Sequence, residues 1–210
     1  MVVGFLATLM SLTVHEFAHA WMADRLGDDT PRRHGRMTLN PLVIIAAHPV
    51  GALVAPLLGA ANGFLFGWAA TPVNPARVRR GINMRTADVL ISAAGPASNV
   101  LLAVAAGGLF YLLQSVEADW TAPLRLLTAC LVVSNVLLAI FNMLPVPPLD
   151  GYHVLSAKAP ESWRPVLNTI EQYSFLLFLL VFFKAGSLIM PVLMHIIPNI
   201  ILYTWAVGPV

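Results

Sequence analysis

Residues 89–116 read VLISAAGPASNVLLAVAAGGLFYLLQSV and contain no Asp, Glu, Lys or Arg. A bilayer core requires about 20 consecutive apolar residues per helix, so this run is long enough to cross it. Three further charge-free runs cover residues 37–76, 126–149 and 185–210. Only 10% of the chain is charged, against about 25% in soluble domains. These runs predict an all-α polytopic membrane protein with about five to six transmembrane helices.

Basic residues indicate which loops face the cytoplasm. Eight of the twelve Lys and Arg residues lie in two loops on either side of residues 41–70: Arg25, Arg32, Arg33, Arg36, Arg77, Arg79, Arg80 and Arg85. The positive-inside rule places both loops on the cytoplasmic side, so residues 41–70 have to enter and leave the membrane there. Three prolines and four glycines interrupt this stretch, which argues against a single span. We expect a re-entrant, β-like loop region between the first two core spans, packed against protein or a wet cavity.

The apolar runs divide the chain into a membrane-embedded core and a C-terminal helical part. We expect the core to cover residues 1–155 and further membrane helices to cover residues 156–210. The elements expected within the core are a helix at 1–25, a cytoplasmic loop and re-entrant segment at 26–87, helices at 88–113 and 123–144, and a proline-rich motif at 142–151. Two C-terminal helices are expected near 165–183 and 187–207. Asp88 is expected to cap the helix that follows it.

Charge and cysteine content exclude several other classes of protein. The net charge is +2, and the basic residues are too few and too scattered to form a nucleic-acid-binding face. Cys130 is the only cysteine, so a disulfide framework and a cysteine metal site are both excluded. The expected partner is therefore the lipid bilayer and not a nucleic acid. The oligomeric state is left open, a homo-oligomer included.

The first apolar run contains the sequence His15-Glu16-Phe17-Ala18-His19. Two histidines four residues apart lie on one face of a helix and can direct ring nitrogens at one zinc ion. The glutamate between them can accept a proton from a metal-activated water. A pair of polar residues at a helix end is the alternative, but ionisable groups within a membrane span are costly to keep and indicate function. The motif predicts a zinc site with Glu16 as the general base.

A catalytic zinc takes three protein ligands and keeps one open position, so a third ligand is needed. Residues 142–151 read NMLPVPPLDG, and the three prolines prevent the preceding helix from continuing. This break aims Asp150 from a non-helical segment at the membrane end that holds His15 and His19, which selects it as the third ligand. A surface turn is the alternative, since Asp and Gly favour turns. Asp88 is a second candidate, although N-capping suits it better.

Other polar residues near these motifs have two interpretations each. Asn142 and Asn135 are seven residues apart on one helical face, where they line the approach to the site or bind substrate, or else form hydrogen bonds between helices. The second role suits Asn135 better. His153 is close enough to Asp150 in the chain to orient a ligand. His48 is a candidate shield for the metal or an ordinary loop residue.

Together, the two metal motifs resemble the site-2 protease family of intramembrane zinc metalloproteases. The resemblance extends from about residue 8 to residue 155. Supporting matches are Gly35-Arg36-Met37-Thr38-Leu39-Asn40-Pro41, Phe66-Gly67-Trp68, Pro72-Val73-Asn74-Pro75 and Ala94-Gly95-Pro96-Ala97-Ser98-Asn99. Members commonly have Asp before a proline where this chain has His48-Pro49. The resemblance implies one zinc ion held by His15, His19 and Asp150, Glu16 as the general base, Asn142 at the substrate or oxyanion position, and a site that opens toward the cytoplasm.

The expected function is hydrolysis of a peptide bond in or near a transmembrane segment of a membrane-protein substrate, by a multi-pass protein of the cell membrane. A substrate helix must first unwind, because its peptide groups are hydrogen-bonded to one another. Strand addition near residues 36–40 or 64–75 would hold the unwound segment. A catalytically silent membrane scaffold or a metal transporter with a zinc site is the alternative. Replacement of Glu16 separates the two, because only a protease needs this carboxylate.

Overall fold

The computed structural model describes residues 1–61, 67–116 and 118–180, and within these ranges it contains helices and irregular segments but no β-strand. The helices are α1 (Val2–Leu26), α2 (Thr30–Arg33), α3 (Pro41–Ala47), α4 (Ala55–Ala61), α5 (Met84–Gln114), α6 (Thr121–Asn142), α7 (Asp150–Lys158), α8 (Arg164–Gln172) and α9 (Ser174–Leu180). A π-helical turn at Val50–Val54 precedes α4. The all-α prediction is confirmed for the described residues.

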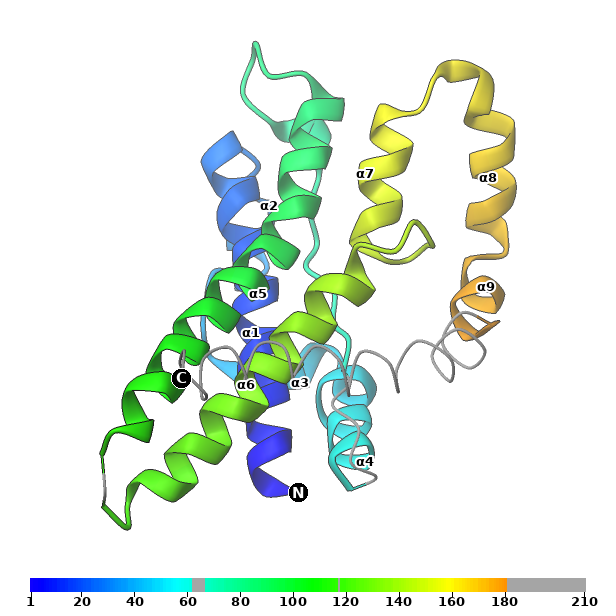
Figure 1. Cartoon of the computed structure of the whole chain (residues 1–210). Coiled ribbons are helices and arrows are strands. Elements are labelled where there is room, and N and C mark those ends of the chain that lie inside the picture. The colour runs from blue at the N-terminus through cyan, green and yellow to red at the C-terminus, as the bar shows by residue number, and fades with distance from the viewer. Residues whose placement is uncertain (62–66, 117, 181–210) are drawn as a thin grey trace, which may run out of the picture.

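Three of the described helices, α1, α5 and α6, are long and apolar enough to cross a membrane. Each packs against the other two, and Figure 1 shows the chain running along α1, back along α5 and forward again along α6. The total of about five to six spans stays a prediction. The single helix expected near 165–183 is wrong for the described residues, because α8 ends at Gln172 and α9 begins at Ser174. The helix expected at 187–207 lies outside the described residues.

Small side chains allow these three helices to approach one another closely. Ala7 of α1, Ala106 of α5 and Val132 of α6 belong to one buried cluster, as is common where helices pack within a membrane. Large apolar side chains point outward instead: Leu101 is 71% exposed and Leu112 is 63% exposed. Such an extensive apolar exterior suits a lipid environment.

Residues 41–61 and 67–74 pack beside α1 as a series of short elements and an irregular segment. Leu12 of α1 forms a buried cluster with Ile44 of α3 and Ala52 of the π-helical turn. An irregular segment, residues 67–74, then returns toward α5, and the Trp68 amide donates to the Gly51 carbonyl oxygen at 3.0 Å. Glycine is needed at position 51, because a Cβ there would lie 2.8 Å from the Trp68 indole. The expected β-like character is wrong for the described residues of this region, because the chain forms short helical elements through residue 61 and no strand in residues 67–74. The re-entrant course of this region stays a prediction, and residues 62–66 are outside the described ranges.

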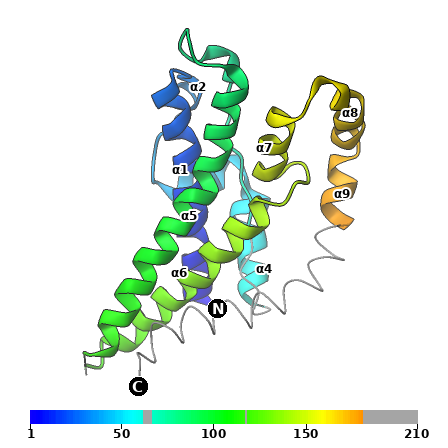
Figure 2. The same ribbon diagram turned by 45° about the horizontal axis from the view of Figure 1, so that its top comes forward.

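The loop after α1 is tied to the segment that leads into α5. The Asp28 carboxylate is fully buried and accepts hydrogen bonds from Thr30 and from the backbone amide of Asn74. Asp29 forms ion pairs with Arg33 and Arg77, and the hydrogen bond from Arg33 holds the pKa of Asp29 below its ordinary value. Figure 2 shows α2 and the beginning of α5 at the same end of the molecule. The two basic loops therefore lie at one end of the three long helices.

The structure differs from the sequence-based prediction in the residue that caps the N-terminus of α5. The helix starts at Met84, and its N-cap is Asn83, whose side chain accepts a hydrogen bond from the Arg85 amide at 2.9 Å. The prediction that Asp88 caps this helix is therefore wrong. Asn and Asp are nearly equivalent as N-caps, and a polar first turn that projects beyond the apolar run is not visible in a count of apolar residues. The division of the chain near residue 155 stays a prediction.

Candidate metal centre

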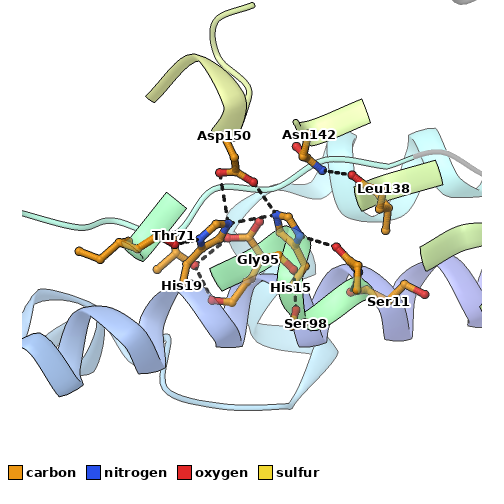
Figure 3. Close-up of polar contacts among 12 residues, drawn as sticks. Ser11, His15, His19, Thr71, Gly95, Ser98, Leu138, Asn142 and Asp150 are labelled. Atoms are coloured by element: carbon orange, nitrogen blue, oxygen red, sulfur yellow. Dashed lines mark hydrogen bonds and ion pairs between the residues drawn. The ribbon is translucent and has the colours of Figure 1, made fainter. Parts of the chain in front are cut away.

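Helix α1 brings His15, Glu16 and His19 to one buried site. Residues four apart in a helix lie one above the other, and the rings of His15 and His19 are 4.6 Å apart between centroids. The exposed fractions of the three residues are 3%, 5% and 8%. Figure 3 shows both imidazoles pointing toward Asp150.

Helix α5 forms the wall behind the two imidazoles, and Gly95 makes this possible. A Cβ at position 95 would lie 2.6 Å from the Cε1 atom of His15 and equally close to that of His19. Because real Cβ atoms are essentially never this close to another heavy atom, the backbone of α5 can approach the rings only at a glycine.

Asp150 reaches the histidines from the first turn of α7. Its Oδ2 atom lies 3.3 Å from His15 Nε2 and its Oδ1 atom 3.3 Å from His19 Nε2. The structure therefore brings together all three residues predicted as ligands. The carboxylate extends from the first residue of α7 rather than from the non-helical segment before it. This segment separates α6 from α7, as the prolines predicted.

The hydrogen bonds of the two histidines determine which ring nitrogen carries the proton. His19 Nδ1 lies 2.7 Å from the Ile91 carbonyl oxygen, which can only accept, so His19 donates from Nδ1. His15 Nδ1 lies 2.6 Å from Asn99 Oδ1 and donates likewise. In neutral imidazoles the two Nε2 atoms then carry lone pairs, although they face each other at 3.0 Å.

This arrangement of atoms fits a bound cation. Two Nε2 lone pairs and a carboxylate converge, and Asp150 Oδ2 is buried without a hydrogen-bond donor. Such a group of acceptors repels itself unless a positive charge lies among them. Zinc binds N and O ligands at about 2.0–2.2 Å in a tetrahedral arrangement, which separates ligand atoms by about 3.3–3.6 Å. The Nε2 to carboxylate distances of 3.3 Å lie at the lower end of that separation, and the 3.0 Å between the two Nε2 atoms is slightly shorter.

Thr71 contacts Glu16, and no motif or spacing in the sequence predicts this contact. Its Oγ1 lies 2.7 Å from Glu16 Oε2 and 3.1 Å from the Glu16 carbonyl oxygen. Thr71 lies in the irregular segment 67–74, and His48 Nε2 contacts the Ala70 carbonyl oxygen of this segment at 2.8 Å. His48 was interpreted either as a shield for the metal or as an ordinary loop residue, and this contact favours the second interpretation.

Two cavities share His15 and Glu16 in their linings, and His19 lines one of them. One, of about 300 Å³, is mainly apolar and includes Leu12, Trp68, Phe141 and Phe178 in its lining. The other, of about 380 Å³, is more polar, and its lining includes Asp88, Ser92, Asp150 and His153. Asn142 and Ala70 line both cavities. His15 and Glu16 therefore border both an apolar and a more polar cavity.

The two asparagines of α6 have different surroundings. Asn142 lines both cavities, and one of its Nδ2 hydrogens is donated to the Leu138 carbonyl oxygen at 2.9 Å. Asn135 is fully buried and bonds to Asn99 of α5 and Ser11 of α1. Asn135 therefore forms hydrogen bonds between helices, which was the preferred of its two predicted roles. Asp88 and His153 line the polar cavity, and neither belongs to the group of ligand atoms around Asp150.

Comparison with known proteins identifies the family. The chain is 36% identical over 179 residues to "Putative zinc metalloprotease YwhC" of Bacillus subtilis (strain 168), and the match covers 83% of this chain and 77% of YwhC. The model of the family described as "Peptidase family M50" matches residues 106–183. The chain belongs to peptidase family M50. Family M50 is the site-2 protease family, so the predicted resemblance to that family is confirmed.

Other M50 relatives are longer than this chain. Rip2 of Mycolicibacterium smegmatis is 33% identical over 172 residues, which are 80% of this chain and 62% of that protein. Rip2 of Mycobacterium tuberculosis (strain H37Rv) is 33% identical over 183 residues, which are 86% of this chain and 66% of that protein. The chain thus spans less than two thirds of either Rip2 protein. No solved structure gives a significant match. The three apolar helices and the M50 family together identify a membrane protein.

Proposed function

We propose that this M50 protein is an intramembrane zinc metalloprotease that cleaves a peptide bond in or near a transmembrane segment of a membrane-protein substrate. One observation carries the proposal: His15, His19 and Asp150 converge beside Glu16, between two cavities and among three apolar helices. His15, His19 and Asp150 would hold one zinc ion. The basic loops follow α1 and precede α5, and His15 and His19 lie in the half of α1 nearest to them. This supports a site that opens toward the cytoplasm of a multi-pass cell-membrane protein.

The residues of the chain divide the chemistry among them. Zinc, when bound, would polarise a substrate carbonyl and lower the pKa of water to about 7. Glu16 takes the proton of the attacking water as the new carbon–oxygen bond forms, and then gives a proton to the amine as the carbon–nitrogen bond breaks. Asn142 carries a second amide hydrogen, which can donate to the substrate carbonyl oxygen as negative charge develops there.

The irregular segment 67–74 is the part of the chain best placed to hold an unwound substrate. It borders both cavities and contributes Trp68, Ala69 and Ala70 to the apolar one. An unwound peptide can form main-chain hydrogen bonds with an extended neighbour, while its apolar side chains occupy the cavity of about 300 Å³. Substrates with helix-weakening residues near the cleavage site should therefore be preferred.

Removal and return of the metal test the proposed function directly. We expect a chelator to abolish cleavage of a helical membrane substrate by the purified protein in lipid vesicles. Added Zn²⁺ should restore cleavage and added Mg²⁺ should not, since imidazole ligands favour zinc over magnesium. Cleavage is measured by electrophoresis and mass spectrometry of the products, and zinc content by elemental analysis. Cleavage that persists in zinc-free protein would contradict the proposal.

Substitution of Thr71 tests how Glu16 is held. A hydrogen bond to a charged group contributes about 1.5–3 kcal/mol, and 1.36 kcal/mol in a barrier is about tenfold in rate. We therefore expect Thr71→Val to lower kcat by about tenfold or more with unchanged zinc content. Thr71→Ser is the matched control, because it keeps the hydroxyl group and should retain most of the activity. Equal kcat values for Thr71→Val and Thr71→Ser would show that the contact is not used.

A further inference from the structure

A buried chain of polar side chains connects His15 to the interior of the three-helix core. Ser11, Asn99 and Asn135 come from α1, α5 and α6, and each is 0% exposed. Asn99 Oδ1 is 2.6 Å from His15 Nδ1, Asn99 Nδ2 is 2.7 Å from Asn135 Oδ1, and Asn135 Nδ2 is 2.7 Å from Ser11 Oγ. Unpaired polar groups are costly in such surroundings, so the direction of each bond follows from counting donors and acceptors.

The direction is set by backbone carbonyl groups, which can only accept. Ser11 Oγ donates its single hydrogen to the Ala7 carbonyl oxygen at 2.7 Å, so it accepts from Asn135. The second Nδ2 hydrogen of Asn135 is donated to the Leu131 carbonyl oxygen at 2.8 Å. Asn135 Oδ1 is then left to accept from Asn99. The second Nδ2 hydrogen of Asn99 is directed at the Ser11 carbonyl oxygen, 3.3 Å away.

The amide of Asn99 therefore has one orientation, with its oxygen toward His15. His15 must donate from Nδ1, and its Nε2 lone pair points at Asp150 and His19. The other tautomer would place a hydrogen on Nε2, which lies 3.0 Å from His19 Nε2 and 3.3 Å from Asp150 Oδ2, where it would block metal binding. His19 needs no such chain, because the backbone carbonyl group of Ile91 fixes its tautomer directly.

We propose that Ser11, Asn135 and Asn99 act together as positioning residues that fix the tautomer and ring orientation of His15 and thereby set its affinity for zinc. This inference rests on the proposed function, because it treats His15 as a zinc ligand. Partners that orient a metal-binding histidine change metal affinity by about 10–100-fold when they are replaced. The expected change in zinc affinity is caused by loss of the hydrogen-bond acceptor at position 99 and not by a general change in interhelical packing.

Two substitutions at position 99 separate these roles. Asn99→Leu removes the acceptor and keeps a similar volume, so we expect zinc affinity to fall by about 10–100-fold. Asn99→Asp gives up the donor to Asn135 but keeps an acceptor for His15 Nδ1, and carboxylates commonly orient zinc-binding histidines. Its zinc affinity should remain within about threefold of the original protein. Should Asn99→Leu not fold, Asn99→Ala gives the same comparison with a smaller side chain.

Ser134→Ala is the matched control for the loss of a buried polar contact. Ser134 is 0% exposed, and its hydroxyl group lies 3.4 Å from that of Thr8 between α1 and α6, the same pair of helices that Ser11 and Asn135 join. Neither residue contacts His15. We expect Ser134→Ala to leave zinc affinity unchanged even if it lowers thermal stability as much as Asn99→Leu does.

Two measurements on the full chain decide the matter. Competition with a chromophoric chelator gives zinc affinity, and ¹⁵N NMR of histidine-labelled, zinc-free protein gives the tautomer of His15. We expect a protonated Nδ1 in the original protein and a mixture of tautomers in Asn99→Leu. Equal loss of affinity in Asn99→Leu, Asn99→Asp and Ser134→Ala, or an unchanged tautomer in Asn99→Leu, overturns the inference. One further result separates this inference from the proposed function. If the tautomer of His15 depends on Asn99 but the protein neither retains zinc nor cleaves substrate, the proposed function is overturned and the effect of Asn99 on His15 stands.

Discussion

Replacement of Glu16 by Gln should abolish measurable cleavage while leaving zinc in place. General acid and base catalysis contributes about 10²–10⁴-fold to a rate, and the amide of Gln cannot take the proton of the attacking water. The substitution keeps the size of the side chain, and its amide oxygen can still accept from Thr71, which contacts Glu16 Oε2 at 2.7 Å. The folded structure and the metal ligands should be unaffected. The measurement is the single-turnover cleavage rate of a helical membrane substrate in lipid vesicles, with zinc content determined on the same sample.

Glu161→Gln is the control for loss of a carboxylate elsewhere. Glu161 is exposed, forms ion pairs with Arg85 and Arg164, and contributes to neither cavity at the metal centre. Its replacement should leave the cleavage rate unchanged. If Glu16→Gln cleaves as fast as the original protein, the protease assignment fails. A protein that binds zinc and shows no cleavage even with Glu16 present would favour the scaffold or transporter alternative.

Replacement of Asp150 by Ala should remove both the metal and the activity. The carboxylate is the only anionic member of the predicted ligand set, and both of its oxygens lie 3.3 Å from an imidazole Nε2. Loss of a direct ligand should weaken zinc binding by more than the roughly 10–100-fold that loss of an orienting partner causes. The zinc content of purified protein should therefore fall well below one ion per chain, and cleavage should fall with it.

Asp88→Asn provides the matched control for Asp150→Ala. Asp88 lines the same polar cavity as Asp150 but does not belong to the group of converging ligand atoms. We expect this variant to bind zinc as the original protein does. Equal zinc affinity in Asp150→Ala and the original protein would remove Asp150 from the ligand set, whatever its activity.

Much of the site could be predicted because its chemistry is local in the sequence. The spacing of His15 and His19 fixes their common face as soon as the segment is helical. The prolines before Asp150 predicted the break that separates α6 from α7. The charge-free runs predicted α5 and α6, and the apolar first run predicted α1. In each case the physical constraint acts on neighbouring residues and so leaves a pattern in the chain.

The remaining contacts depend on residues that are far apart in the chain. Thr71 reaches Glu16 from the irregular segment 67–74, and a single threonine there has no periodic or spacing signal. The bond between Asn99 and Asn135 depends on how α5 and α6 are rotated about their axes, which apolar runs leave undetermined. Asp88 was misplaced for a different reason, because Asn83 is an equally good N-cap outside the apolar run.

The contact at Gly95 has a consequence for how the centre tolerates sequence change. Behind the imidazoles lie main-chain atoms of α5, and these are the same for every amino acid. Substitution at position 95 can only add atoms, and a Cβ there would lie 2.6 Å from both rings. The two histidines are therefore supported by a main-chain surface, and substitutions of neighbouring side chains do not change the atoms of this surface. The α5 backbone at Gly95 limits where the two rings can lie, and the contacts of His15 with Asn99 and of His19 with Ile91 then orient them.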